Sequence, residues 1–380
     1  MNKFKFYFIL FSFTFVLFSC DKSSSDSTIP IRDFAVQYAA DIAIIEDYLN
    51  THYLVVDDNQ DVTISKITET DVHPSMMTLL NSETFPKLLV KEVALDDITY
   101  EIYYIKLKAD NVDGIAPTRV DGVFCSYKGS YLYYKTTQEL VVDKNGNPVL
   151  GPDNVQLTTD VTTLNTSQFT NVLFPEDYIR LDGTIRGWTE IFPLFKTGNK
   201  HVVSGEPISF TEFGAGIIFI PSGLGYYNIV RPGIPSYSPL VYSFKLNEVK
   251  FLDQDQDGIL SNNEDLIGDL DFTNDDTDGD GIQNLYDVED DGDGYFTLTE
   301  IKRPDIIING VKTSNGYYPY NGAAIDDPAT LYIDERQGIP RKFTGPIDEV
   351  TGLPTPLESD FTDPTRLRRH LDPTCFPPYQ

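Results

Sequence analysis

The segment 253–300 constrains the folding of this chain more than any other feature. It holds 17 Asp or Glu residues and no Lys or Arg. Carboxylates at this density repel one another, so without cations the segment should be disordered. The whole chain of 380 residues has a net charge of −29, and this segment supplies more than half of it. Such a charge excludes nucleic acid as a partner, because phosphate-binding sites need clustered cations.

The acidic segment repeats one pattern three times, at 253–264, 276–287 and 289–300, with acidic residues at positions 1, 3 and 5 and Gly at position 6. This is the spacing of the EF-hand calcium loop, which supplies six to eight oxygens from one turn of chain. A solvated acidic linker is the alternative, but it would not repeat the glycine. We therefore predict structural Ca²⁺ sites. Their ligands would be Asp253, Asp255, Asp257, Ile259 (backbone carbonyl), Ser261 and Glu264; then Asp276, Asp278, Asp280, Asn284 and Asp287; then Glu289, Asp291, Asp293, Thr297 and Glu300.

The second and third loops begin 13 residues apart, which leaves no room for the paired helices of an EF-hand. This tight spacing resembles thrombospondin type 3 repeats, in which calcium ions form the core. The resemblance implies that calcium stiffens a joint between the preceding domain and the tail, 301–380. That tail is rich in Pro, Gly and Asp and is predicted to be dominated by loops.

The N-terminus has the features of an export signal. Lys3 and Lys5 precede an apolar run, Phe6 to Phe18, that is too short for a transmembrane helix. Its ending, "LFSC", resembles a bacterial lipoprotein box. This predicts a signal peptide at 1–19 and a lipidated Cys20 on a polar tether, 20–32, anchored to a bilayer of the bacterial cell envelope, with the outer membrane as the expected one. The alternative is an ordinary signal peptide with a chance Cys.

The region between tether and acidic segment is predicted to be α+β. Apolar residues recur at helical spacing in 33–50, where Asp33 is a candidate cap. Strand patterns follow at 98–108, 121–129, 215–221 and 239–251. We divide this part into an N-terminal helical and strand region, 33–94, and a domain, 95–250. Cys125 lies in a strand and is expected to be a buried free thiol, although a disulfide to Cys375 is the alternative.

Four pieces of 95–250 occur in the order found in FKBP-type peptidyl-prolyl cis-trans isomerases. "VFCSYKG" (123–129) is similar to the family's strand ending in Tyr-x-Gly. "TIRGWTEIFPLFKTGNK" (184–200) resembles its Ile-x-Gly-Trp segment and short helix. "IFIPSGLGYYN" (218–228) and "PGIPSYSPLVYSFKL" (232–246) resemble its last loop and hairpin. The resemblance implies an antiparallel sheet wrapped on a short helix.

The resemblance also implies a pocket that receives a substrate proline. Trp188 would be its floor, Ile185 would supply a wall and a backbone N–H, and Tyr226 would donate its hydroxyl to a substrate carbonyl. The remaining walls would be Tyr127, Ile234 and Tyr242, the last standing where the family usually has Phe. The alternative for each is ordinary core packing. Proline isomerisation makes and breaks no bond, so catalysis would need no cofactor. The partners would be proline-containing polypeptides, and the activity would assist folding of exported proteins.

Two departures from the family keep other functions open. The family's Gly-x-x-Phe-Asp-Ser segment is missing and an insertion, 130–180, stands in its place, while Pro193 lies within the short helix. A catalytically weak or inactive binding or chaperone module is therefore one alternative, and a calcium-dependent surface adhesion or docking protein is another. A hydrolase or nucleotide enzyme is disfavoured, because the sequence has four His without a metal-binding pair and lacks both a nucleophile elbow and a phosphate loop.

Overall fold

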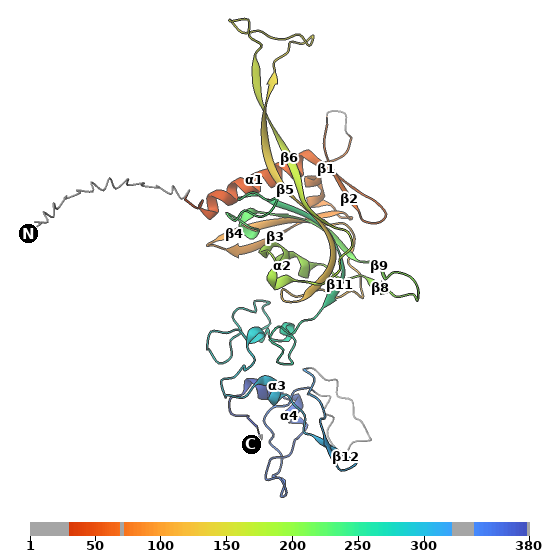
Figure 1. Cartoon of the computed structure of the whole chain (residues 1–380), viewed down its shortest axis with the longest axis vertical. Coiled ribbons are helices and arrows are strands. Elements are labelled where there is room, and N and C mark those ends of the chain that lie inside the picture. The colour runs from red at the N-terminus through yellow and green to blue at the C-terminus, as the bar shows by residue number, and fades with distance from the viewer. Residues whose placement is uncertain (1–29, 69–71, 321–337, 378–380) are drawn as a thin grey trace, which may run out of the picture.

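The computed structural model describes residues 30–68, 72–320 and 338–377. A sheet domain, the acidic segment and the tail follow one another along the long axis (Figure 1). The predicted signal peptide and Cys20 lie outside the described residues. None of the helices in the described ranges is long and apolar enough to cross a membrane.

One seven-stranded antiparallel sheet forms the first domain. Its strand order is β3-β4-β10-β11-β5-β6, and β7 pairs with β5. The strands are β3 (Lys87–Leu95), β4 (Ile98–Lys106), β5 (Gly122–Leu140), β6 (Thr158–Val172), β7 (Ile179–Arg180), β10 (Gly214–Ile220) and β11 (Leu240–Lys250). A large antiparallel sheet with few helices agrees with the α+β prediction.

A helix covers each face of this sheet. On one face lies α1 (Phe34–Thr51), whose Ile45 and Leu49 pack with Ile217 and Phe219 of β10. On the other lies α2 (Arg186–Ile191), whose Trp188 shares a core with alternate sheet residues. Because both faces are covered, all seven residues of β10 are buried, which explains why its sequence is apolar without alternation.

The expected boundary at residue 95 does not separate two structural units. Leu95 ends β3 and pairs with Ile98 at the start of β4, so the two strands form one hairpin of the sheet. The N-terminal helix begins where predicted, and Asp33 caps it by accepting a hydrogen bond from the Val36 N–H at 3.0 Å. The region 33–94, which also contains the hairpin of β1 (His52–Val56) and β2 (Val62–Lys66), therefore belongs to the sheet domain.

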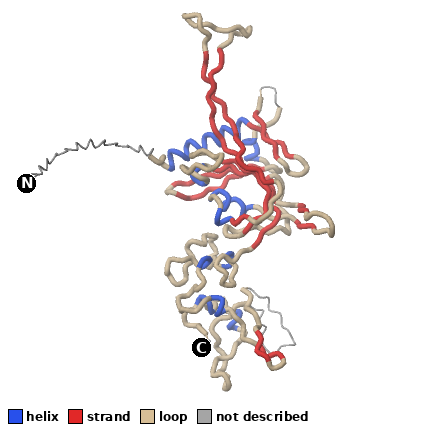
Figure 2. The backbone as a smooth tube through the Cα atoms, viewed as in Figure 1, coloured by secondary structure: helices blue, strands red, loops and turns tan. Residues whose placement is uncertain are grey.

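The insertion forms a long two-stranded arm. Strands β5 and β6 pair without interruption from Ser130 and Gln168 to Leu140 and Thr158, and they project away from the sheet domain (Figures 1 and 2). A second, smaller hairpin, β8 (Asn199–His201) with β9 (Ser209–Thr211), lies beside the sheet. The arm extends away from α2 (Figure 1).

Helix α2 lies unusually close to β10 because its second residue is Gly187. A Cβ at this position would stand 2.6 Å from the Ile220 side chain, so the contact admits only glycine. The helix gives way to a 3-10 turn, Phe192–Leu194, and Pro193 lies in this turn. Pro193 therefore follows the α-helical turn that carries Trp188 instead of interrupting it.

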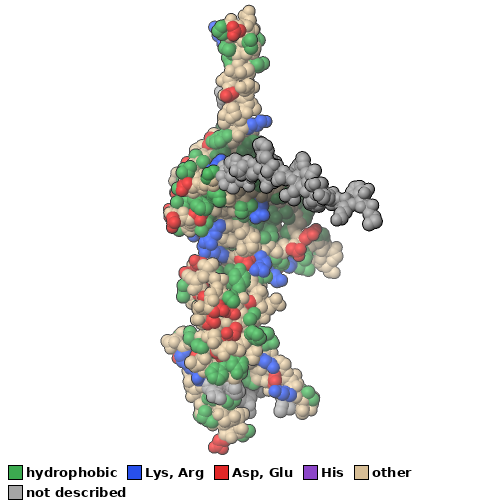
Figure 3. Space-filling model, turned by 60° about the vertical axis from the view of Figure 1, so that its left-hand side comes forward, with side chains coloured by type: hydrophobic (Ala, Val, Ile, Leu, Met, Phe, Trp, Pro, Cys, Tyr) green, Lys and Arg blue, Asp and Glu red, His purple; other side chains and the backbone are tan. Residues whose placement is uncertain are grey.

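In their described residues, the acidic segment and tail contain short 3-10 turns and the short elements α3 (Thr297–Glu300), β12 (Ile306–Ile308), β13 (Val311–Thr313) and α4 (Ser359–Thr362). Figure 3 shows acidic side chains gathered between the sheet domain and the tail. The tail has a small core, built from Ile301, Tyr318, Ile339 and Phe361 together with Ile259 of the acidic segment. Cys125 and Cys375 are both buried and free, as expected for Cys125 and against the alternative disulfide.

Candidate functional site

All six residues predicted for the pocket line one cavity of about 750 Å³. They come from four separate segments of the chain: Tyr127 from β5, Ile185 and Trp188 from the start of α2, Tyr226 and Ile234 from the loop between β10 and β11, and Tyr242 from β11. The antiparallel order β10-β11-β5 brings these segments together, with α2 packed across them.

Trp188 lies at the centre of an aromatic cluster. The rings of Tyr127 and Tyr242 each meet its indole edge-on, at centroid distances of 5.1 Å, while the Phe192 ring lies tilted against it at a centroid distance of 4.9 Å. Edge-to-face pairs of this kind are favourable and hold each ring in a defined orientation. Trp188 is 4% exposed, yet its indole N–H has no hydrogen-bond partner among the described residues. The cluster is therefore both packed core and cavity wall.

The polar groups of the cavity are mainly tyrosine hydroxyls and arginines. Burial raises the pKa of Tyr242, and the neighbouring Tyr226 hydroxyl adds to this effect; burial also raises the pKa of Tyr127. These hydroxyls therefore remain protonated at neutral pH and can donate hydrogen bonds. The Arg231 guanidinium lies 5.3 Å from the centroid of the Tyr226 ring. Among the described residues, no carboxylate lines the cavity.

Sequence reasoning allowed that the insertion replaces a wall of the pocket, but it did not identify the residues that do so. Phe169 and Thr170, at the base of β6, line the cavity, and the Phe169 ring meets Tyr242 edge-on at 5.7 Å. Gly129 makes this possible, because a Cβ there would lie within 3 Å of Thr170, Tyr242 and Phe169. The signal was the strand-like alternation of residues 158–172, which reveals a strand but not its partner.

The N-terminal helix fastens the loop that carries Tyr226. Asp41 accepts hydrogen bonds from the backbone N–H and hydroxyl of Ser222, which begins the 3-10 turn before that loop. The Tyr227 hydroxyl donates to the backbone carbonyl of Arg32, and the Phe34 and Tyr227 rings stack at 4.4 Å. An Asp on the buried side of an apolar helix is a sequence signal for such a contact.

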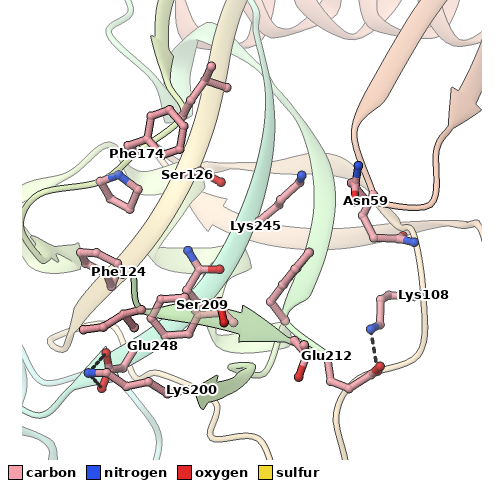
Figure 4. Close-up of a pocket in the computed structure, with 18 of the residues that line it drawn as sticks. Asn59, Lys108, Phe124, Ser126, Phe174, Lys200, Ser209, Glu212, Lys245 and Glu248 are labelled. Carbon is pink, nitrogen blue, oxygen red and sulfur yellow. Dashed lines mark hydrogen bonds and ion pairs between the residues drawn. The ribbon is translucent and has the colours of Figure 1, made fainter. Parts of the chain in front are cut away.

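A larger cavity, of about 860 Å³, lies elsewhere on the sheet domain, and Figure 4 shows it. It contains none of the predicted site residues. Its three lysines are each paired with an acid: Lys108 with Glu212 at 2.7 Å, Lys200 with Glu248 at 2.9 Å, and Lys245 with Asp61 at 2.7 Å. The paired charges leave it no net cationic character for an anion, and we assign it no chemistry.

The three acidic loops repeat one backbone conformation. The glycines at position 6, Gly258, Gly281 and Gly294, have φ of +96°, +97° and +88°. L-residues rarely adopt these values, which explains the repeated glycine. In each loop the three acidic residues at positions 1, 3 and 5 have carboxylate oxygens within 4.8 Å of one another. These nine are Asp253, Asp255 and Asp257; Asp276, Asp278 and Asp280; and Glu289, Asp291 and Asp293.

Positions 9 and 12 depart from the expected ligand pattern. The side chains at position 9, Ser261, Asn284 and Thr297, hydrogen-bond to the residue at position 2 of their own loop and so hold the loop closed. Of the residues at position 12, Glu264 joins a compact carboxylate group, whereas Asp287 and Glu300 do not. Ile259 contributes its buried side chain to the tail core.

Burial makes the first loop electrostatically unfavourable without a cation. Burial, together with the neighbouring carboxylates, raises the pKa of Asp257 to about 8 and that of Glu264 to about 10. Both oxygens of Glu264 and the Oδ2 atoms of Asp255 and Asp257 are buried without a hydrogen-bond partner among the described residues. Carboxylate oxygens arranged in this way fit Ca²⁺, which takes oxygen ligands only.

Comparison with known proteins gave matches to separate parts of the chain. A family model described as BamM C-terminal matches residues 254–332, which is the acidic segment and the beginning of the tail. The match covers under half of the chain and leaves the sheet domain unassigned. The comparison with curated proteins gave no match.

Several solved structures align with part of the chain. A peptidyl-prolyl cis-trans isomerase from Pseudomonas syringae pv. tomato is 16% identical, covers 58% of this chain and 98% of its own, and has a TM-score of 0.29. FkpA from Escherichia coli is 24% identical, with coverages of 46% and 55% and a TM-score of 0.26. The three FKBP domains of wheat FKBP73 are 15% identical, with coverages of 43% and 51% and a TM-score of 0.26. The chain thus spans about half the length of the last two, and TM-scores this low carry no inference by themselves.

Proposed function

We propose that this protein is an FKBP-type peptidyl-prolyl cis-trans isomerase whose substrate proline enters the cavity at Trp188. One observation carries the proposal. Residues from four segments that resemble this family in sequence line a single aromatic cavity, although they are separated by up to 115 positions from Tyr127 to Tyr242. Ordinary core packing would leave no cavity among them.

The proposed mechanism requires only that the cavity bind the twisted X-Pro amide, because no covalent bond is made or broken. The barrier to rotation about an X-Pro bond, about 18–20 kcal/mol, comes from amide resonance. As the amide twists, its nitrogen loses conjugation and its carbonyl becomes less polar. A dry cavity walled by Trp188, Tyr127 and Phe169 stabilises this less polar state relative to the hydrated planar one. This is preferential binding of the transition state.

Two donors would orient the peptide. The Tyr226 hydroxyl would donate to a substrate carbonyl oxygen, and the N–H of Ile185 would donate to another. Ile185 is the N-cap residue of α2 and has an extended backbone, so its N–H is outside the helix. Its carbonyl accepts the N–H of Trp188 at 2.9 Å, which couples the donor to the cavity floor.

The test is isomerisation of a short X-Pro peptide by the purified full chain in calcium, with Trp188→Ala and Tyr226→Phe as variants. We expect Trp188→Ala to abolish acceleration. Tyr226→Phe should lower kcat/KM by about tenfold, the equivalent of one hydrogen bond. Tyr242→Phe is the matched control: it removes a hydroxyl from the same cavity and should change the rate less than threefold.

No acceleration by folded wild-type protein would contradict the proposal. In the family that the chain resembles, the Asp of the Phe-Asp-Ser segment lines the pocket, whereas no carboxylate among the described residues lines this cavity. The activity measurement should therefore be accompanied by a measurement of peptide binding. Binding without catalysis would instead establish the inactive binding or chaperone module. Calcium-dependent adhesion without catalysis and without peptide binding would establish the third alternative, a calcium-dependent adhesion or docking protein.

We further propose that Cys20 carries a lipid that anchors the protein to a bilayer of the bacterial envelope, where its clients are exported polypeptides containing proline. The motif around Cys20 supports this. Mass spectrometry of the purified N-terminus would test it: a diacylated Cys20, lost in Cys20→Ala, is expected. An unmodified Cys20 in protein purified from its own host would contradict it.

We also propose that Ca²⁺ is a structural ion of the acidic segment. The nine clustered carboxylates at positions 1, 3 and 5 would hold it, and the buried oxygens without partners support this. The segment contacts the sheet domain through Arg119, whose guanidinium donates to the Leu270 carbonyl at 2.9 Å, and through Tyr286, whose hydroxyl donates to Asp182 at 3.1 Å. An ordered segment would therefore hold the tail in place relative to α2.

A further inference from the structure

We propose that the first and third acidic loops share one Ca²⁺, held by Asp257 and Glu264 of the first loop and Asp290 of the third. This rests on the calcium loops proposed above. It adds a ligand that occupies position 2 of its own loop and lies outside the repeated pattern. It also adds a cross-link between loops that are separate in sequence.

The three carboxylates form one compact, buried group. Each contributes an oxygen to a cluster whose atoms all lie within 4.8 Å of one another. Asp257 is 1% exposed, and Glu264 and Asp290 are each 3% exposed. The Oδ2 of Asp257, the Oδ1 of Asp290 and both Glu264 oxygens are buried without a hydrogen-bond partner among the described residues.

In Asp257 and in Asp290, a hydrogen bond to one carboxylate oxygen fixes the orientation of that residue's second oxygen. The Oδ1 of Asp257 accepts the N–H of Ile259 at 2.7 Å, and the Oδ2 of Asp290 accepts the Thr297 hydroxyl at 3.0 Å. Each of these side chains is thereby held, and its second oxygen remains available. Glu264, at position 12 of its loop, offers both of its oxygens, as the bidentate residue of a calcium loop does.

No cation in the described part of the chain balances these charges. Among the described residues none of the three takes part in an ion pair, and the acidic segment contains no Lys or Arg. Buried carboxylates without a partner are strongly destabilising. A divalent cation that prefers oxygen ligands meets this need, and water can complete its coordination.

The site would join the two ends of the acidic segment where the tail core begins. Ile259 follows Asp257 by two residues, Ile301 follows the third loop directly, and both are buried in that core. The loops are already in contact, because a Cβ on Gly258 would stand 2.7 Å from the Ile301 side chain. A shared ion would lock this contact and so order the tail.

The test measures Ca²⁺ binding to the full chain by titration calorimetry, for wild type and Asp290→Asn. The asparagine keeps an acceptor for Thr297 but replaces the available oxygen with an NH₂ group. We expect one site to weaken by at least about tenfold, because calcium affinity follows the number of charged ligands. Asp269→Asn is the control: it removes the same charge from an exposed residue outside all the carboxylate groups and should leave every site unchanged.

The outcomes distinguish failure of the shared-site proposal from failure of the proposal that the loops bind calcium. Calcium binding by wild type with unchanged affinity in Asp290→Asn overturns the shared site alone. No calcium binding by wild type overturns the shared site and the calcium loops together. If Asp290→Asn does not fold, hydrogen exchange of the wild-type protein across a calcium titration would test whether the first and third loops share an ion. Protection of 253–264 and 289–300 at one common calcium concentration supports the shared ion, whereas separate midpoints overturn it.

Discussion

The carboxylate of Asp41 accepts hydrogen bonds from both the backbone N–H and the hydroxyl of Ser222, at 2.7 and 2.5 Å, across 181 residues of sequence. Both residues are buried, at 1% and 0% exposure. Ser222 begins the turn that leads into Gly225 and Tyr226, which line the candidate pocket. The N-terminal helix is therefore a support of the pocket, even though none of its residues lines the cavity.

We expect Asp41→Ala to lower the free energy of unfolding by about 1–3 kcal/mol, because two buried donors on Ser222 lose their partner. It should also weaken binding of an X-Pro peptide, because the Tyr226 loop loses its attachment to α1. Chemical denaturation and peptide titration would measure the two effects. Asp47→Ala is the control, since Asp47 accepts its hydrogen bond from Tyr134 at an exposed position on the same helix. Equal effects in both variants would contradict the supporting role.

The same contact predicts a pH dependence. Burial raises the pKa of Asp41 from 3.8 to about 6 in the folded state, against the opposing hydrogen bonds from Ser222 and Gln37. Between these two values the folded protein binds more protons at Asp41 than the unfolded chain does. The contribution of Asp41 to stability therefore falls as pH rises through this window, by about 3 kcal/mol in total.

Asp41→Asn removes this titration, so the difference in unfolding free energy between wild type and variant should change between pH 4 and pH 7. Wild type should lose stability relative to the variant on going to the higher pH. Denaturation at both pH values in saturating calcium would measure it. A difference that is constant with pH would show that Asp41 does not titrate in this window.

Gly187→Ala should displace α2 from the sheet. The new Cβ would stand 2.6–2.9 Å from three atoms of Ile220, which is buried in β10 and cannot move freely. We expect a loss of about 1–3 kcal/mol from overpacking, with reduced peptide binding as Trp188 moves. Gly183→Ala is the matched control four residues earlier, where a Cβ meets nothing within 4 Å. Equal stability of the two variants in thermal denaturation would contradict close packing of α2.

Removal of calcium should melt the acidic segment and the tail while leaving the sheet domain folded. The segment depends on cations to balance its carboxylates, and Ile259 and Ile301 connect it to the tail core. The sheet has separate cores on its two faces. Hydrogen exchange with chelator should therefore show rapid exchange from residue 253 onward and unchanged protection in β4, β10 and β11. Loss of protection in β10 would contradict this independence.

The residue pattern by itself determined the features that depend on neighbours in sequence. The Asp33 cap, the apolar helical spacing that follows it, and the glycine at position 6 of each acidic loop all report local backbone conformation. The resemblance of four segments to the FKBP family implied six pocket residues, and all six line one cavity.

Only the tertiary structure decided which distant residues meet. The register of β5 against β6 brings Phe169 beside Tyr242, the packing of α1 brings Asp41 to Ser222, and the folding of the acidic segment brings Asp290 to Glu264. Periodicity and spacing describe the conformation of one segment, whereas strand order, register and buried charge are properties of several segments packed together. The packing of several segments therefore completed the pocket and the shared carboxylate group.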